Sequence, residues 1–82
     1  MMKFVKVEWD DAHSICAWTS DADNFDCAKI VSLGWVIHED DNKIVLTSSK
    51  NLTNGDYGDL LAIPRGCITD ITEMPLAFDV EK

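Results

Sequence analysis

Strict alternation of apolar and charged side chains near the N-terminus constrains the fold more than any other feature of the sequence. In residues 3–9, the apolar Val5, Val7 and Trp9 alternate with the charged Lys6 and Glu8. Successive side chains of a β-strand point to opposite faces, so this pattern predicts a strand with one face buried and the other in water. A lone strand has no stability in water, and the rest of the chain must therefore supply a sheet.

Four more strands are expected farther along the chain, at residues 27–38, 43–48, 57–63 and 68–73. Residues 39–42 predict a tight turn, and Asn54-Gly55-Asp56 is typical of a hairpin. Pro64 has no amide hydrogen to donate, so residues 64–67 predict a compact turn of 3₁₀ helix before the last strand. Residues 10–26 break the alternation and predict a long loop that contains a short helical turn.

The two faces of the expected second strand differ in composition. The face that is continuously apolar is predicted to point into the core. It consists of Val31, Leu33, Trp35 and Ile37. The opposite face consists of Ser32, Gly34, Val36 and His38. Gly34 in the middle of this strand indicates a bend or the close approach of another backbone.

The order of these elements predicts an all-β fold, a small five-stranded SH3-like barrel with a long first loop. A small antiparallel sheet with one apolar face curls so that it buries that face on itself. The related Sm-like barrel begins with a helix, and no helix is expected before the first strand here, so the SH3-like plan is preferred. The 82 residues form a single domain, with the barrel at 3–73 and an apolar tail at 74–82.

The balance of charge excludes some partners. The chain has 15 acidic and 7 basic residues and a formal net charge of -8. Nucleic acids and anionic membrane surfaces are bound by clustered Lys and Arg, so neither is an expected partner. Two interpretations of the acidity stay open, plain solubility and an acidic face that docks on a basic partner. No apolar run reaches the roughly 20 residues of a membrane helix and no signal peptide precedes the first strand, so we expect a cytoplasmic protein.

The sequence predicts neither catalysis nor a cofactor. It offers no nucleophile beside an orienting base, no glycine-rich phosphate loop and no pair of catalytic carboxylates. His38, Glu39, Asp40 and Asp41 gather possible metal ligands, but a hairpin turn of this length cannot wrap an ion with its own side chains. A solvated acidic turn is the preferred interpretation, and no metal site is expected.

Aromatic residues are the first candidates for a binding surface. In SH3-like domains the long first loop often supports a ligand groove lined by aromatic side chains. Trp18 and Phe25 lie in the expected loop, and Tyr57 begins the expected fourth strand. The alternative for Trp18 is that its ring covers an open end of the barrel.

Charged residues supply the other binding candidates. Asp40 and Asp41 would meet a partner protein at the expected tight turn. Arg65 follows Pro64, where its planar guanidinium could hold a phosphate or a carboxylate in bidentate fashion. The alternative is a surface ion pair between Arg65 and Asp59 or Asp70, which would contribute little.

Three segments of the chain carry a resemblance to a known group of proteins. The segments are residues 7–10, residues 34–41 with 44–46, and residues 58–68, which read VEWD, GWVIHEDD with IVL, and GDLLAIPRGCI. They resemble small uncharacterised proteins that bacteriophages and prophages encode. The resemblance covers most of the chain outside residues 10–26 and the tail, and it implies a phage accessory protein in a bacterial cytoplasm.

Two functions follow as hypotheses. The first is a non-catalytic binding module that acts on a host protein. The second is an oligomeric binder, or sponge, of a small nucleotide signal used in host defence, with Arg65 and Lys50 as the available cations. The apolar tail residues would then join copies into a homo-oligomer. They are Leu76, Phe78 and Val80.

Overall fold

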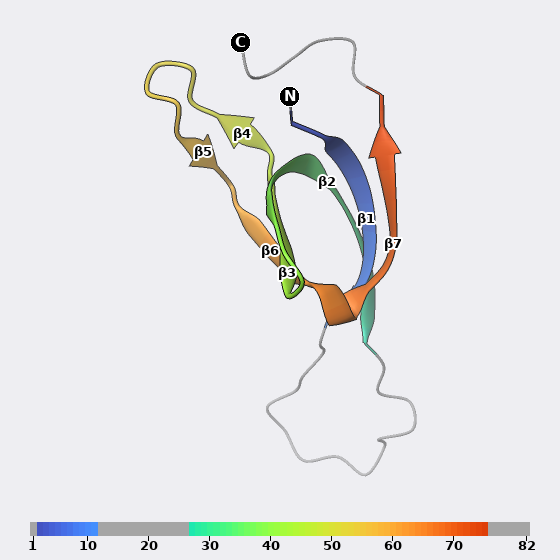
Figure 1. Cartoon of the computed structure of the whole chain (residues 1–82). Helices are drawn as coiled ribbons and strands as arrows, with labels where there is room; N and C mark the ends of the chain where they lie inside the picture. The colour runs from blue at the N-terminus through green and yellow to red at the C-terminus, as the bar shows by residue number, and fades with distance from the viewer. Residues whose placement is uncertain (1, 12–26, 76–82) are drawn as a thin grey trace.

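The computed structural model of the chain describes residues 2–11 and 27–75, and these residues form an all-β structure (Figure 1). The strands and the single 3₁₀ turn in this part of the chain follow one another in a simple order. They are β1 (Phe4–Asp11), β2 (Ala28–Glu39), β3 (Lys43–Thr47), β4 (Ser49–Lys50), β5 (Tyr57–Gly58), β6 (Leu61–Pro64), η2 (Arg65–Cys67) and β7 (Ile68–Met74). Within the described ranges, no helix is long and apolar enough to cross a membrane.

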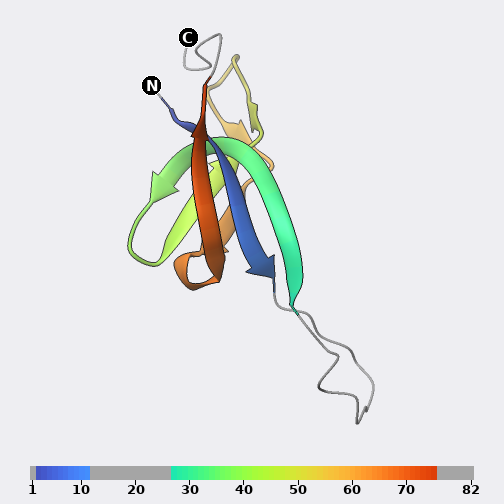
Figure 2. The same cartoon turned by 90° about the vertical axis from the view of Figure 1, so that its right-hand side faces the viewer.

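Five of the strands form one antiparallel sheet in the order β6-β3-β2-β1-β7, while β4 pairs only with β5. The long strand β2 connects the two halves of this sheet. Its register with β1 runs from Ala28 to Trp35, and its register with β3 begins at Trp35. Figure 2 shows β2 arching from the β1 side of the molecule to the β3 side. The bend brings the two halves of the sheet face to face.

The core lies between these halves, and the first strand contributes to it as predicted. The buried apolar side chains are Val5, Val7, Ile44, Leu46 and Ile63. Trp9, Val36 and Ile68 are partly buried and pack against this cluster. The alternating pattern of residues 3–9 is therefore confirmed, since Val5 and Val7 are buried while Glu8 is exposed.

The predicted orientation of β2 is wrong. Val31 and Leu33 are 60% and 57% exposed, whereas Gly34 is buried and Val36 packs against the core. Trp35 also lies on the outer face, where its ring centroid is 5.1 Å from that of Phe4. The contacts that β2 makes with other strands, and not the hydrophobicity of its two faces, decide which face is buried.

Two contacts fix this orientation. Gly34 lies so close to β3 that a Cβ atom there would be 3.0 Å from the Thr47 carbonyl oxygen and 3.1 Å from the Leu46 Cβ. The close backbone approach expected at Gly34 is thus confirmed. On the same face, the indole Nε1 of Trp9 donates a 3.0 Å hydrogen bond to the Ser32 hydroxyl. A glycine and a small hydroxyl on the inner face let β2 cross tightly over its neighbours.

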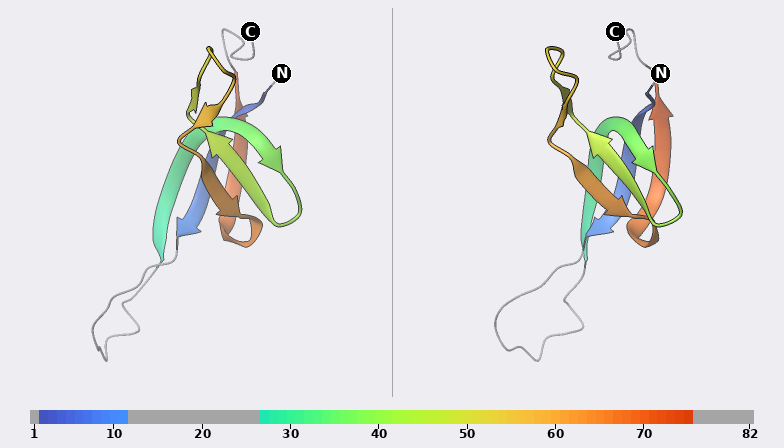
Figure 3. Two further views of the ribbon diagram at one scale, coloured as in Figure 1. Left: turned by 90° about the vertical axis from the view of Figure 1, so that its left-hand side faces the viewer. Right: turned by 60° about the vertical axis from the view of Figure 1, so that its left-hand side comes forward.

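The expected third strand is confirmed as β3 and is followed by the short β4, whereas the expected fourth strand is interrupted. Residues 43–50 divide into β3 and β4, and residues 57–64 divide into β5 and β6, with Asp59 at a positive φ of 53° between them. The β4–β5 hairpin therefore leaves the main sheet, and Figure 3 shows it extending beyond the ends of β3 and β6. The predicted hairpin turn is confirmed, because Gly55 has a φ of 83° and its amide donates to the Asn51 carbonyl.

The turn after Pro64 and the strand that follows it agree with the prediction. Residues Arg65–Cys67 form one turn of 3₁₀ helix, and β7 pairs antiparallel with β1 along its length. The helical turn expected within residues 10–26 falls on the undescribed segment 12–26. The apolar tail with Leu76, Phe78 and Val80 likewise lies outside the described residues, so its role in forming a homo-oligomer stays a prediction.

Candidate functional site

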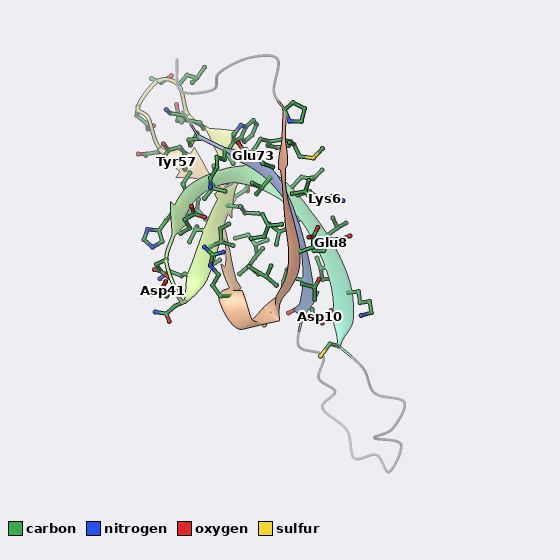
Figure 4. The ribbon with its side chains drawn as sticks, turned by 45° about the vertical axis from the view of Figure 1, so that its right-hand side comes forward. Lys6, Glu8, Asp10, Asp41, Tyr57 and Glu73 are labelled. Carbon is green, nitrogen blue, oxygen red and sulfur yellow. The ribbon has the colours of Figure 1, made fainter. Side chains whose placement is uncertain are left out.

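The outer face of the β2-β1-β7 half of the sheet is the first candidate surface. Paired residues of antiparallel strands point to the same face, so the register places its side chains in rows. The rows are Trp35, Phe4 and Met74, then Leu33, Lys6 and Thr72, and then Val31, Glu8 and Asp70. Figure 4 shows Lys6 and Glu8 projecting to the same side of β1. This outer face thus presents an apolar stripe along β2 beside a mixed polar surface on β1 and β7.

The apolar stripe on the outer face is well exposed. Val31 and Leu33 expose more than half of their surface, and Met74 exposes 36%. Exposed apolar residues that occur singly are ordinary on protein surfaces, whereas neighbouring ones make a surface a candidate for contact. Sequence reasoning missed this surface because it assigned Val31 and Leu33 to the core.

One edge of β2 lies open next to this stripe. In the described part of the chain, residues 28–34 pair with β1 on one side, and β3 takes up the other side only from Trp35 onward. A groove of about 250 Å³ lies against this edge. Its lining residues are Ser32, Leu33, Leu46, Thr47, Ser48, Asp59 and Leu61. The groove combines an apolar floor with a carboxylate and hydroxyl groups.

A second hollow, of about 350 Å³, lies at the other end of the β2 edge. Its lining residues are Glu8, Trp9, Asp10, Lys29, Ile30, Val31 and Thr69. This hollow lies near the end of β1 and the start of β2, between which the undescribed segment 12–26 runs in the sequence. The groove beside Leu33 lies within described elements and is the better defined of the two.

Arg65 and Asp40, both predicted as site residues, are brought together by the structure. The Nε–H of Arg65 donates a 3.0 Å hydrogen bond to the backbone carbonyl of Asp40, and its Nη2 lies 3.5 Å from a Glu39 carboxylate oxygen. Arg65 therefore ties η2 to the turn between β2 and β3. Its expected ion-pair partners were Asp59 or Asp70, and the structure gives it Glu39 instead because the Asp40–Asn42 turn folds against η2.

The Asp40 side chain stabilises the turn in which it lies by hydrogen bonds. One carboxylate oxygen accepts the backbone N–H groups of Asn42 and Lys43, and the other lies 2.8 Å from the His38 Nε2. These contacts stabilise the charged form, so the hydrogen bond to His38, followed by those from the two amides, holds the pKa of Asp40 well below its ordinary value. A hydrogen bond from Lys3 similarly lowers the pKa of Glu39.

The other predicted site residues lie elsewhere. Asp41 is exposed next to Asp40, but Tyr57 stands on the β4–β5 hairpin at a distance from it (Figure 4). Tyr57 is 39% exposed, and the Lys50 ammonium lies 5.5 Å from its ring centroid. Trp18 and Phe25 fall on the undescribed segment 12–26. The structure therefore does not assemble Tyr57, Asp40 and Arg65 into one surface.

The acidic turn does not form a metal site, since no three side chains of the ligating types converge in the described ranges 2–11 and 27–75.

Comparison with known proteins identifies no relative: no family model, curated protein or solved structure matches the chain. The chemistry of the candidate surfaces is thus apolar contact, main-chain hydrogen bonding and acidic charge.

Proposed function

We propose that the chain is an SH3-like barrel that works as a non-catalytic protein-interaction module. The strand order β6-β3-β2-β1-β7, with a 3₁₀ turn between β6 and β7, agrees with the SH3-like plan. The bend of β2 across both halves of the sheet supports the same assignment. The Sm-like barrel is the alternative fold, and its defining helix would precede the first strand.

The observation that carries this proposal is the exposure of Val31 and Leu33 on β2. Sheets of this size usually keep one face apolar and the other polar, and here the outward face of the longest strand is apolar as well. Burying the exposed part of these two side chains would favour a complex, because removing apolar surface from water contributes about 25 cal/mol per Å². We therefore place the contact surface on β2, in addition to the aromatic candidates.

The proposed target is a host protein in the bacterial cytoplasm. The resemblance to phage-encoded proteins supports this setting, and the net charge of -8 favours a partner whose contact surface is basic. The acidic Asp40 and Asp41 stand on the exposed turn that follows β2, so they would add a charged rim to the apolar contact.

The nucleotide-binding alternative depends on Arg65 being available to a phosphate. In the structure the guanidinium of Arg65 is already engaged by the Asp40 carbonyl and the Glu39 carboxylate. A phosphate at this position would compete with Glu39 for the guanidinium and would be repelled by its charge. This arrangement favours a protein partner over a nucleotide.

A matched pair of variants tests the proposal. Leu33→Thr introduces a residue that suits a strand but removes the apolar contact, while Leu52→Thr makes the same change at a position that is 74% exposed on the hairpin. Host proteins retained by the immobilised wild-type chain in a bacterial lysate are identified by mass spectrometry. We expect Leu33→Thr to lose the specific partner and Leu52→Thr to retain it. Equal retention by both variants would contradict a contact surface on β2.

A further inference from the structure

We propose that the partner binds by adding a β-strand to the open edge of β2, and that it does so with an extended segment in which apolar and basic residues alternate. The segment pairs through its backbone with residues 28–34 and places every second side chain in the groove beside Leu33. This inference rests on the proposed function, because it names the class of partner that the contact surface on β2 receives.

The edges of the sheet differ in how they are protected. Exposed strand edges pair readily with other chains, and proteins block them with proline, charged side chains, bulges or short strands. The edge strand β6 has four residues and ends at Pro64. The edge strand β7 carries Asp70 and Glu73, has an irregular register with β1, and is followed by Pro75.

Within residues 2–11 and 27–75, the open edge of β2 has none of this protection along most of its length. Residues 28–34 read AKIVSLG and contain Lys29 as their only charged residue. Their pairing with β1 is continuous from Ala28 to Gly34, without an irregularity. An edge of this length, regular and bordered by exposed apolar side chains, is the edge of this sheet that can receive another strand.

The groove supplies sites for the side chains of the added strand. Leu46, which is 2% exposed, lies at its base, and Leu33 and Leu61 flank it at 57% and 37% exposure. Side chains on one face of a strand repeat every second residue, about 7 Å apart. Alternate apolar side chains of an added strand would therefore lie beside Leu33 on the outer face while its backbone pairs with β2, and the side chains between them would point toward the Asp59 side of the groove.

Charge selects the remaining residues of the partner segment. The Asp59 carboxylate lines the groove, and its contacts with the Ser48 and Ser49 hydroxyls, at 3.4 and 3.3 Å, are long and both involve Oδ2. A Lys or Arg of the added strand would complement this carboxylate. A second copy of the chain would instead bring another net charge of -8, so a basic partner fits the edge better.

Selection from a displayed library of random peptides tests the proposal directly. We expect the full-length protein to enrich peptides that alternate apolar residues with Lys or Arg and that have no central proline. Asp59→Asn should weaken the selected peptide about tenfold, because it removes the charge yet tolerates the positive φ of this position. Leu33→Thr should weaken it at least as much, and Leu52→Thr should leave its affinity unchanged.

Amide hydrogen exchange separates strand addition from contact with the outer face. A paired strand should slow exchange at alternate amides of residues 28–34, and replacing a central residue of the peptide by proline should abolish both protection and binding. If the peptide binds through Leu33 without protecting these amides, strand addition is wrong while the protein-interaction function stands. Two results would overturn the proposed partner: a library that yields no peptide, or a protein that is a dimer in solution and becomes a monomer in Leu33→Thr. In either case the lysate experiment would still test the protein-interaction function.

Discussion

Gly34 is the residue on which the path of β2 depends. It lies on the inner face where β2 crosses β3, and backbone rather than a flexible side chain occupies the space next to it. Gly66, in the 3₁₀ turn, faces open space, and a Cβ atom added there would have no neighbouring atom within 4 Å. The two glycines therefore have opposite tolerance for a methyl group.

We expect Gly34→Ala to lower the free energy of unfolding by about 1–3 kcal/mol, because β2 and β3 must move apart. Gly66→Ala should change it by less than about 0.5 kcal/mol. Urea unfolding followed by tryptophan fluorescence measures both values. An unchanged midpoint for Gly34→Ala would show that the crossing of β2 over β3 is looser than the structure has it.

Asp40 makes stability depend on pH. Its folded-state pKa is below the ordinary value of 3.8, so the unfolded chain binds more protons in acid than the folded one. The stabilisation is present above the ordinary pKa and is lost as the pH falls below it. Asn at this position can still accept the amide hydrogen bonds of the turn, but it does not titrate.

We therefore expect wild type to be more stable than Asp40→Asn at about pH 7, and the difference to shrink as the pH falls toward about 3. Asp40→Ala should be the least stable at neutral pH, because it also loses the bonds to Asn42 and Lys43. Urea unfolding across this pH range gives the comparison. A difference between wild type and Asp40→Asn that does not vary with pH would contradict the role of the Asp40 charge.

At the scale of elements, the β4–β5 hairpin is attached to the sheet through one buried side chain. Thr47 is 1% exposed, and its hydroxyl contacts the carbonyl oxygens of Ser49, at 2.8 Å, and of Gly58. The same oxygen accepts the amide of Ser49 at 3.3 Å. A hydroxyl at the base of the hairpin thus satisfies backbone groups on both of its strands.

We expect Thr47→Val, which conserves shape, to lower the free energy of unfolding by about 1 kcal/mol, because it removes the hydrogen bonds between a buried hydroxyl and these partly buried backbone groups. Thr72→Val is the matched control, since the Thr72 hydroxyl is exposed and donates only to Asp70. Amide exchange should quicken within residues 49–58 in the first variant and not in the second. Unchanged exchange there would mean that the hairpin is held by other contacts.

The elements also differ in how well their sequences predicted them. In β1 only one face is apolar, so its alternation was sufficient to identify the buried side chains. In β2 the more apolar face points outward, because the approach of Thr47, which is far away in sequence, requires Gly34 to lie on the inner face. The glycine was itself the available signal, because a close crossing requires the small residue to lie on the inner face.

Candidate site residues were likewise predicted only where the local sequence decides their position, and not where distant contacts decide it. Arg65 was predicted as a site residue, but its partner Glu39 is set by how the turn at residues 40–42 meets η2, which no local pattern encodes. The contact surface on β2 was hidden because exposed and buried apolar residues have the same sequence signature. Trp18 and Phe25, on the undescribed segment, stay predicted contact residues.

At the scale of the whole molecule, the proposed recognition of a partner depends on both charge and apolar surface. The outer face carries Lys6 and Lys29 against Glu8, Asp10 and Asp70, a net charge of -1, while the whole chain has -8. The described residues include ten acidic and six basic side chains, a net charge of -4, so most of the negative charge in this part of the chain lies away from the apolar stripe. Such a distribution attracts a basic partner from a distance without burying many unpaired carboxylates on contact.

Salt should consequently act on the rate of association and not on the rate of dissociation. For a basic peptide selected on this protein, we expect the association rate to fall about tenfold between about 0.05 M and about 0.5 M NaCl, because added ions shorten the range of the attraction. The dissociation rate should change little, since apolar contacts at Leu33 and backbone pairing hold the complex. Stopped-flow fluorescence measures both rates, and the same peptide with Gln in place of Lys and Arg is the control. If the control and the basic peptide respond equally to salt, the acidity of the chain serves solubility and takes no part in recognition.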